Sequence, residues 1–318
     1  MGLIDAHKFL RGAVRGQPSY GFDEGRMYAR GPALLASYPV PHMLGTFAVA
    51  QEELDSALSR MPSEPVVSGG DGAIVLRSGR LRSTIDLLDY ASPGNAPAPD
   101  DAWPEPPAGL LAALGRALPF VSDSGTWNRS VKLETGRVLA MSGFSAVAVD
   151  VPGLEVEGHL ALTDEVAEYL SKLPPPARWL VDASSVSFSW ASGAWVRCQS
   201  TALPWPDGVF DRALGMGVAD GDPVAISDAF REAFADVVAL VDGNGVVVVD
   251  PEGMRGKSEH AEHVVAVPTG VAGESQWAIR ALRPVVPVAR RFWPRADGPS
   301  RFEADDARGV VMPRREGR

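Results

Sequence analysis

The chain has 318 residues, of which 45% are hydrophobic and 22% charged, and its formal net charge is −10. The length allows two or three domains, and the composition is that of a globular protein rather than a disordered one. The single cysteine, Cys198, excludes an internal disulfide framework and a thiolate metal cage, no apolar run is long enough to span a membrane, and the first residues lack the apolar core of a signal peptide. We therefore expect a protein of the reducing cytoplasm with no membrane partner.

Charge is unevenly distributed along the chain. Residues 280–318 contain ten Arg and five acidic residues, and residues 1–30 contain five Lys or Arg and three acidic residues, so the acidic excess lies between them. Because local potential governs an encounter with DNA, basic patches on an acidic protein still permit DNA contact. Ordinary solvated surface would give the same distribution.

Six segments have apolar residues at helical spacing, and most are bounded by a capping residue or a proline. The predicted helices cover residues 5–14, 50–60, 107–118, 163–173, 227–238 and 282–292. The last one contains Pro284 and Pro287, which suit a helix only in its first turn. Helices 50–60 and 163–173 are rich in acidic residues.

Alternating runs with turn signals separate these helices. Residues 73–87 turn at Ser78 and Gly79, residues 186–198 turn at Ser192 and Gly193, and residues 237–250 turn at 242–245. Cys198 ends one such run, and we expect it to be a small apolar filler. One helix followed by antiparallel strands, six times over, is a repeat architecture, and paired units predict three domains of an α+β protein.

Motifs for chemistry are weak in this sequence. His260 and His263 have the spacing of a helical metal pair but no third ligand nearby, and a solvated loop is the better interpretation. Residues 242–245 lack the Glu of a calcium loop, and residues 215–221 lack the Lys of a phosphate loop. The serines around Gly143 do not form a nucleophile elbow. We predict no catalytic residue, metal or cofactor, and an enzyme with an unrecognised site is the alternative.

The end of the chain carries the most specific pattern. Residues 302–309 have the pattern of a polar hairpin edge, and residues 310–313 are Val-Val-Met-Pro. This Val-Val-Met-Pro after an acidic turn resembles the end of the bacterial β sliding clamp of DNA polymerase III. Residues 137–149 resemble the strand–turn–strand of that family. Ala140 and Gly143 match its pattern there, whereas Met141, Ser142, Phe144 and Ser145 replace its Thr, Asp, His and Arg. Residues 203–208 resemble the family's Phe-Pro-Asp-Tyr segment.

This resemblance implies the DNA-clamp fold, in which three similar domains each pack two helices on antiparallel sheets and close into a ring. The implied domains are 1–98, with a shortened N-terminus, 99–215 and 216–318. Three domains per chain imply a head-to-tail homodimer ring. The short first domain suits a divergent version of phage origin.

The implied function is that of a sliding clamp, a processivity factor that encircles duplex DNA without reading its sequence. DNA polymerase and the clamp loader are the implied protein partners, and they bind through short peptide motifs. The alternative is a non-enzymatic, β-rich structural or interaction protein of phage or bacterial origin, whose apparent repeat is coincidental.

Carried over from the resemblance, the pocket for the partner peptide is lined by residues of three segments. They are Gly143, Phe144 and Ala146, then Pro206 and Arg212, and finally Val310, Val311, Met312 and Pro313. Methionine suits an adaptable recognition surface. The structural alternative is that Val310 to Met312 only completes the last sheet.

Basic residues on two predicted helices and one loop are the candidates for DNA contact. Lys8, Arg11 and Arg15 give the first helix a basic face, Arg283, Arg290 and Arg291 recur on the sixth, and Trp127 and Arg129 follow the third. The alternative for each is a solvated cation or a packed tryptophan. The acidic helices 50–60 and 163–173 depart from a uniformly positive ring lining.

Overall fold

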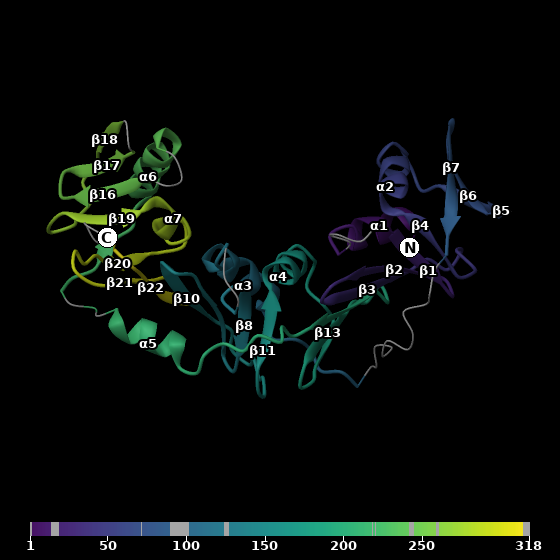
Figure 1. The fold of residues 1–318 in the computed structure, drawn as a ribbon, viewed down its shortest axis with the longest axis horizontal. Helices are drawn as coiled ribbons and strands as arrows, with labels where there is room; N and C mark the ends of the chain where they lie inside the picture. The colour runs from purple at the N-terminus through teal and green to yellow at the C-terminus, as the bar shows by residue number, and fades with distance from the viewer. Residues whose placement is uncertain are drawn as a thin grey trace. The chain divides into compact units, whose positions relative to one another are not determined.

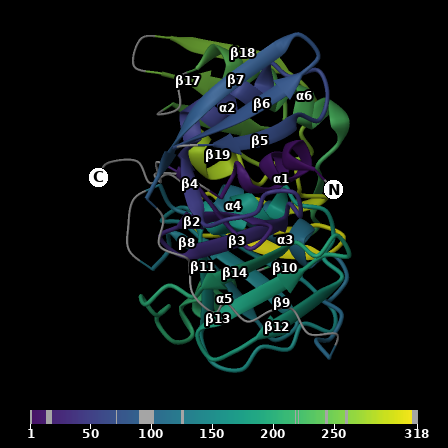
Figure 2. The ribbon, with the colours of Figure 1, turned by 90° about the vertical axis from the view of Figure 1, so that its right-hand side faces the viewer.

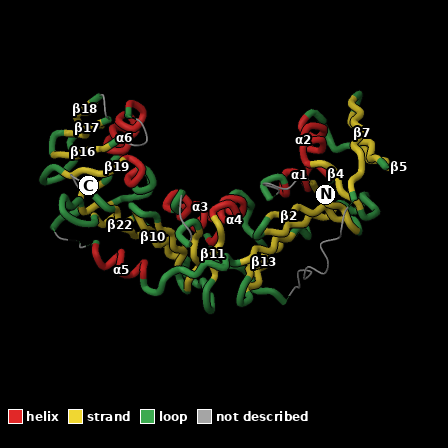
Figure 3. Tube along the Cα trace, viewed as in Figure 1, coloured by secondary structure: helices red, strands yellow, loops and turns green. Residues whose placement is uncertain are grey.

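The computed structural model describes residues 2–13, 19–70, 72–89, 102–123, 127–217, 219, 221–241, 245–258 and 261–313. The chain divides into two compact units, which are drawn in Figures 1 and 3. The first unit consists of residues 1–111 and 156–201, and the second consists of residues 112–155 and 202–318.

The same order of elements occurs three times along the chain: a helix followed by four strands, then a second helix followed by three strands. The first repeat is α1 (Leu3–Leu10), β1 (Ser19–Asp23), β2 (Arg26–Gly31), β3 (Leu34–Pro39), β4 (Phe47–Ala50), α2 (Gln51–Ser59), β5 (Val66–Gly70), β6 (Ala73–Ser78) and β7 (Leu81–Leu88). The second is α3 (Leu110–Ala117), β8 (Ser130–Glu134), β9 (Arg137–Met141), β10 (Ser145–Asp150), β11 (Leu160–Thr163), α4 (Asp164–Ser171), β12 (Arg178–Val181), β13 (Ser185–Ser189) and β14 (Trp195–Gln199).

The third repeat is α6 (Asp228–Leu240), β16 (Val246–Asp250), β17 (Gly253–Lys257), β18 (Glu262–Ala266), β19 (Ser275–Ala278), α7 (Ile279–Leu282), β20 (Arg291–Trp293), β21 (Ser300–Glu303) and β22 (Ala307–Val311). Between the second and third repeats lie α5 (Val209–Met216) and β15 (Val224–Ala225), and a short 3-10 turn, Leu118–Phe120, follows α3. The predicted alternation of one helix with antiparallel strands is confirmed.

The first unit is built on a sheet of ten antiparallel strands in the order β12-β13-β14-β3-β2-β1-β4-β7-β6-β5. Helix α1 packs on it because Leu3, Ala6 and Leu10 share one helix face and are all buried. Helix α2 contacts the strands β1, β4 and β7 (Figure 2). Cys198 is fully buried in β14, as predicted for an apolar filler, and burial raises the pKa of its thiol.

In the second unit, seven strands run in the order β8-β9-β10-β22-β21-β20-β15, and four more form a separate sheet in the order β18-β17-β16-β19. Helix α6 lies on the smaller sheet in contact with β17 and β18 (Figure 1). Gly256 permits this close approach, because a Cβ there would lie 2.6 Å from side-chain atoms of Val237 and Val241. Phe120 and Phe302 stack in the core of the larger sheet, with ring centres 5.7 Å apart.

The sequence located most elements and their starts correctly. Thr163 and Ser227 cap α4 and α6 by accepting hydrogen bonds from the backbone N–H three residues on. Gly79 and Gly193 adopt the left-handed conformation, with φ of 58° and 76°, in the predicted hairpin turns. Helix α1 begins at Leu3 rather than at Asp5, which lies in its first turn.

Two predictions of elements were wrong, and one helix was not predicted. The sixth helix was predicted at 282–292, but α7 covers Ile279–Leu282 and ends where the predicted helix was to begin. Pro284 and Pro287 lack the N–H groups that a helix needs, and turns fill residues 283–288. Residues 237–240 are the end of α6 and not a strand, so only 246–250 is extended, while the predicted turn at 242–245 lies outside the described residues except for Gly245. Helix α5 was missed.

Candidate functional site

Strand β22 lies in the interior of the larger sheet of the second unit. Strand β22 pairs on one side with β10, where Val311 faces Ser145, and on the other side with β21. Val310 and Val311 are therefore buried, at 2% and 0% exposure, while Met312 and Pro313 are half-buried. The accessible part of the motif is its second half.

The turn between β9 and β10 holds Met312, the first residue after strand β22, in place. The Met312 N–H donates to the Phe144 carbonyl at 2.7 Å. The Ser142 hydroxyl oxygen accepts hydrogen bonds from the N–H groups of Phe144 and Ser145, at 3.2 and 3.1 Å, which fixes the shape of the turn. Gly143 is exposed, with open space around its α-carbon.

A residue that the sequence did not indicate completes this corner. Arg280, in α7, lies with its guanidinium carbon 3.9 Å from the centre of the half-buried Phe144 ring. Arginine over an aromatic face is a stabilising cation–π arrangement. The sequence held no signal for this pair, because the two residues are far apart in the chain.

Helix α5 lies against the same two strands, β10 and β22. Gly217, which follows the helix, permits the approach because a Cβ there would lie 2.4 Å from Val310 Cγ1. Pro206 and Arg212 are exposed, and the Arg212 side chain donates to the Asp207 carbonyl at 2.9 Å. The helix is also tied to β9 by Arg137, which forms an ion pair of 3.1 Å with Asp211.

The nine residues predicted to line the peptide pocket thus all lie in the second unit, but they differ in access. Ala146, Val310 and Val311 are buried and build the sheet. Six residues present surface to a ligand: Gly143, Phe144, Pro206, Arg212, Met312 and Pro313. The arrangement offers an apolar edge beside two cations, Arg212 and Arg280, which suits an extended peptide with apolar anchors.

Among the predicted DNA-contact residues of the first unit, Lys8 and Arg11 are exposed near the end of α1. Helix α1 is held to α2 through His7, whose ring nitrogen lies 2.6 Å from the Asp55 carboxylate, and Tyr20 donates to the same oxygen at 3.1 Å. Arg15 lies outside the described residues. The two described cations therefore stand on the solvent side of a well-anchored helix.

In the second unit the predicted DNA-contact residues have varied surroundings. Trp127 packs edge-to-face on Trp205 with ring centres 5.0 Å apart, so its ring belongs to a packed aromatic pair. Arg129 and Arg283 are exposed. Arg290 and Arg291 do not lie on a helix: Arg291 begins strand β20 and pairs with Glu303 at 2.7 Å, and Arg290 precedes it and pairs with Asp305 at 3.6 Å.

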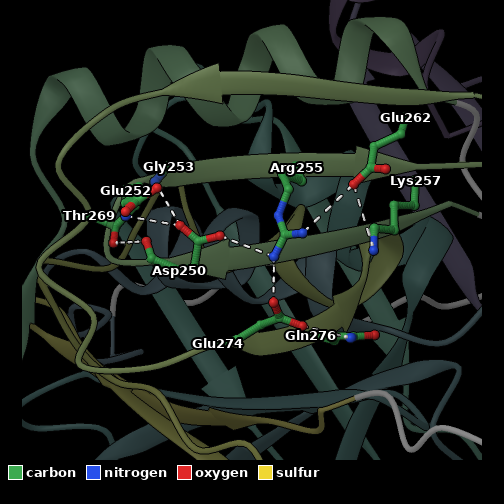
Figure 4. A network of polar contacts seen from close by, with 9 residues as sticks. All are labelled: Asp250, Glu252, Gly253, Arg255, Lys257, Glu262, Thr269, Glu274 and Gln276. Atoms are coloured by element: carbon green, nitrogen blue, oxygen red, sulfur yellow. Dashed lines mark hydrogen bonds and ion pairs between the residues drawn. The ribbon is translucent and has the colours of Figure 1, made fainter.

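A polar network covers one face of the four-stranded sheet (Figure 4). Arg255, on β17, pairs with Asp250 on β16 at 3.1 Å, with Glu262 on the edge strand β18 at 3.8 Å, and with Glu274 just before β19. Hydrogen bonds from Gln276 and Arg255 lower the pKa of Glu274. The hydrogen bond to Glu274 raises the pKa of Arg255, so this ion pair stays charged at neutral pH.

Within the described residues, no group of three or more His, Cys, Asp or Glu side chains is placed to hold a metal ion. His263 lies in strand β18, and His260 is outside the described residues. No described helix is long and apolar enough to cross a bilayer.

No family model and no curated protein sequence matches this chain. Solved structures do match it. The pol III beta of Caulobacter crescentus is 15% identical, with a TM-score of 0.74 over 99% of this chain and 98% of that one. The DNA polymerase III beta subunit of Thermotoga maritima is 15% identical, with a TM-score of 0.76 over 99% and 97%.

The DNA polymerase sliding clamp of Bacillus subtilis is 14% identical, with a TM-score of 0.75 over 99% of this chain and 97% of that one. The chain therefore has the sliding-clamp fold along almost its whole length, with the α+β class and antiparallel sheets that the sequence predicted.

Proposed function

We propose that this chain is a DNA sliding clamp, a non-enzymatic processivity factor that encircles duplex DNA and tethers a replicative polymerase in the cytoplasm. The observation that carries this proposal is the sliding-clamp fold over 99% of the chain, in which the Val-Val-Met-Pro segment ends an interior strand beside an apolar corner. The names of the matching structures are those of polymerase clamps and polymerase β subunits.

Strand pairing supports closure of a ring by a second copy. In two places the last strand of one repeat pairs with the third strand of the preceding repeat: β14 pairs with β3, and β22 pairs with β10. Two strands have no such pairing within the described part of the chain. They are β7, the last strand of the first repeat, and β18, the third strand of the last repeat, and each could pair with a strand of a second copy. Strand β18 is at the edge of its sheet, and β7 pairs with β4 only at Leu87 and Leu88 in the described pairings.

An unpaired strand edge is a ready template for another chain. If β18 of one copy adds to β7 of the next, the contact is heterologous, and two such contacts close a head-to-tail dimer. This closed dimer is the ring that we propose, with domains at 1–98, 99–215 and 216–318.

DNA contact in this ring is proposed to be weak and independent of sequence. Lys8 and Arg11 in the first unit, and Arg129, Arg283, Arg290 and Arg291 in the second, supply cations that phosphates can approach. Phosphate contacts position a protein on DNA without reading bases, and a clamp has to move along the duplex.

The corner formed by Phe144, Met312 and Pro313 beside α5 is proposed to hold the peptide motifs of the polymerase and the clamp loader. Half-buried apolar side chains on a rigid strand end provide a small number of anchors for an extended peptide. Arg212 and Arg280 flank this corner with positive charge and would pair with acidic residues of such a motif.

Mass and DNA topology together test the function. We expect light scattering to give a dimer of twice 33.7 kDa. We also expect the protein to stay on circular DNA through a sizing column and to run off the same DNA once it is cut. A monomer that is retained equally on both, or on neither, would favour the alternative of a β-rich interaction protein.

A further inference from the structure

A cavity of about 410 Å³ in the second unit collects three arginines from separate segments. Arg116 comes from α3, Arg231 from α6, and Arg290 from the bend before β20. The floor is apolar, because Phe120 and Val147 also line the cavity and are buried. Three aspartates complete the lining: Asp228, Asp305 and Asp306.

Each arginine is paired with one of these aspartates. Arg231 pairs with Asp228 at 3.0 Å, Arg290 pairs with Asp305 at 3.6 Å, and Arg116 pairs with Asp306. The second guanidinium nitrogen of Arg231 also donates to the Ala289 carbonyl at 2.8 Å, which fixes that side chain. The cavity is therefore a preformed set of cations whose charge is balanced locally.

The pairs of Arg116 and Arg290 are open to exchange with another anion, whereas the Arg231 side chain is 23% exposed. The side chains of Arg116 and Arg290 are 44% and 61% exposed. Ion pairs at this exposure are weak because solvent screens them, so a competing anion can displace the carboxylates. Guanidinium groups bind phosphate oxygens with paired, charge-assisted hydrogen bonds, which makes a phosphodiester a suitable competitor.

We propose that this cavity is a contact site for the DNA backbone and that its three aspartates hold its affinity down. The inference rests on the proposed clamp function and deepens it. A phosphate that enters must displace a carboxylate and remain near it, so each arginine gives only part of its normal attraction. A ring that moves along the duplex requires contacts of this kind, because tight phosphate binding would stop it.

Removal of the aspartate charges tests the proposal by a gain of affinity. The double variant Asp305→Asn with Asp306→Asn keeps the side-chain shapes and frees Arg290 and Arg116. We expect it to bind duplex DNA more tightly than the wild type. The dependence of log affinity on log salt should steepen by about 0.9 for each arginine freed, and movement along the duplex should slow.

The matched control is Asp297→Asn. Asp297 is 85% exposed and pairs with Arg295 at 3.7 Å, and neither residue lines the cavity. This change also frees one arginine, Arg295, but outside the cavity. We expect it to change the salt slope less than Asp305→Asn alone or Asp306→Asn alone. Adding Arg116→Gln and Arg290→Gln to the double variant should cancel its gain, with the melting temperature confirming a folded protein.

Equal DNA affinity and salt slope for the double variant and the wild type would overturn the proposal, and so would equal gains per charge from the cavity and the control. These outcomes are separate from the test of the clamp function. If the wild type is retained on circular DNA and the Asn variants bind no more tightly, only the role of the cavity fails.

Discussion

The guanidinium carbon of Arg280 lies 3.9 Å from the centre of the Phe144 ring, which joins α7 to the turn between β9 and β10. The carbonyl of the same Phe144 accepts the Met312 N–H at 2.7 Å. Phe144 therefore contacts both Met312, which follows β22, and Arg280, which lies in α7. Its ring is held in place without being fully buried, as the wall of a binding corner should be.

The first prediction concerns this contact. Arg280→Met removes the cation but keeps a long side chain, and we expect it to weaken binding of an extended polymerase-derived peptide by roughly twofold to fivefold, the scale of an exposed cation–π contact. Fluorescence anisotropy would measure the affinity. Arg283→Met, at an exposed arginine beyond the end of α7, is the control and should leave the affinity unchanged. Identical losses in both variants would argue against a specific role for the ring contact.

The second prediction separates the two halves of the C-terminal motif. Met312→Ala should cost the peptide on the order of 1–2 kcal/mol of binding free energy, since it removes a central apolar anchor. The melting temperature and the dimer should change little, because Met312 lies beyond the strand.

Val311→Ala is the counterpart of that change. It should lower the free energy of unfolding by about 2 kcal/mol, because the side chain is fully buried. Deleting residues 310–318 is not an equivalent test, since it removes the end of a strand that lies between β10 and β21. Unchanged peptide affinity for Met312→Ala would remove that residue from the groove.

The sequence predicted the repeated architecture because each unit carries local signals. Thr163 and Ser227 mark helix starts, and Gly79 and Gly193 mark hairpins. The sixth helix was predicted in the wrong place because residues 282–292 have apolar residues at helical spacing, whereas Pro284 and Pro287 prevent a helix there. Helix α5 was not predicted, because the resemblance to a family segment covers only residues 203–208 and the helix begins after them, at Val209.

The candidate site was only partly accessible to sequence reasoning. The motif at 310–313 was visible, but its division into buried valines and an accessible Met-Pro depends on β22 being an interior strand, which pairing alone decides. Arg280 and Arg116 carry no local signal. Each acquires its role from a partner brought close by the fold: Phe144 for the first and Asp306 for the second.

The third prediction concerns DNA contact by α1. Lys8→Glu and Arg11→Glu should each weaken binding to duplex DNA and make it less sensitive to salt, because each removes a cation that phosphates can approach. Stability should change by less than about 0.5 kcal/mol, since both residues are exposed. Arg30→Glu, at an exposed site on strand β2, carries the same charge reversal and serves as the control. Equal losses in all three would indicate a general charge effect and no specific role for α1.

The fourth prediction concerns closure of the ring. Val264, on the edge strand β18, is 67% exposed, and Val264→Glu should weaken the dimer strongly while leaving the melting temperature of the monomer unchanged. Val66, on the edge strand β5, is 72% exposed, and Val66→Glu is the matched control with the same chemistry. Sedimentation equilibrium would give both dissociation constants. A stable dimer of the Val264 variant would contradict seam formation through β18.

The fifth prediction follows from the network around Arg255 that holds β18 on its sheet. Hydrogen bonds from Gln276 and Arg255 lower the pKa of Glu274 in the folded protein, so the folded state binds its proton less readily than the unfolded state. The stabilisation is therefore complete above the unfolded pKa of about 4.3 and is lost as pH falls through the lower folded value. We expect the wild type to melt higher than Glu274→Gln at pH 6, and the difference to disappear only as the pH falls through the lowered folded-state pKa of Glu274 and that carboxylate becomes protonated.

The same network sets an expectation for the seam. Because Arg255 also pairs with Glu262 on β18, Arg255→Met should release the edge strand and weaken the dimer, whereas Glu274→Gln, which leaves the pair with Glu262 intact, should affect the dimer less. High salt screens exposed ion pairs and should reduce the difference between the wild type and Arg255→Met. A dimer as stable in Arg255→Met as in the wild type, at low salt and neutral pH, would show that β18 keeps its position through its backbone pairing with β17 alone.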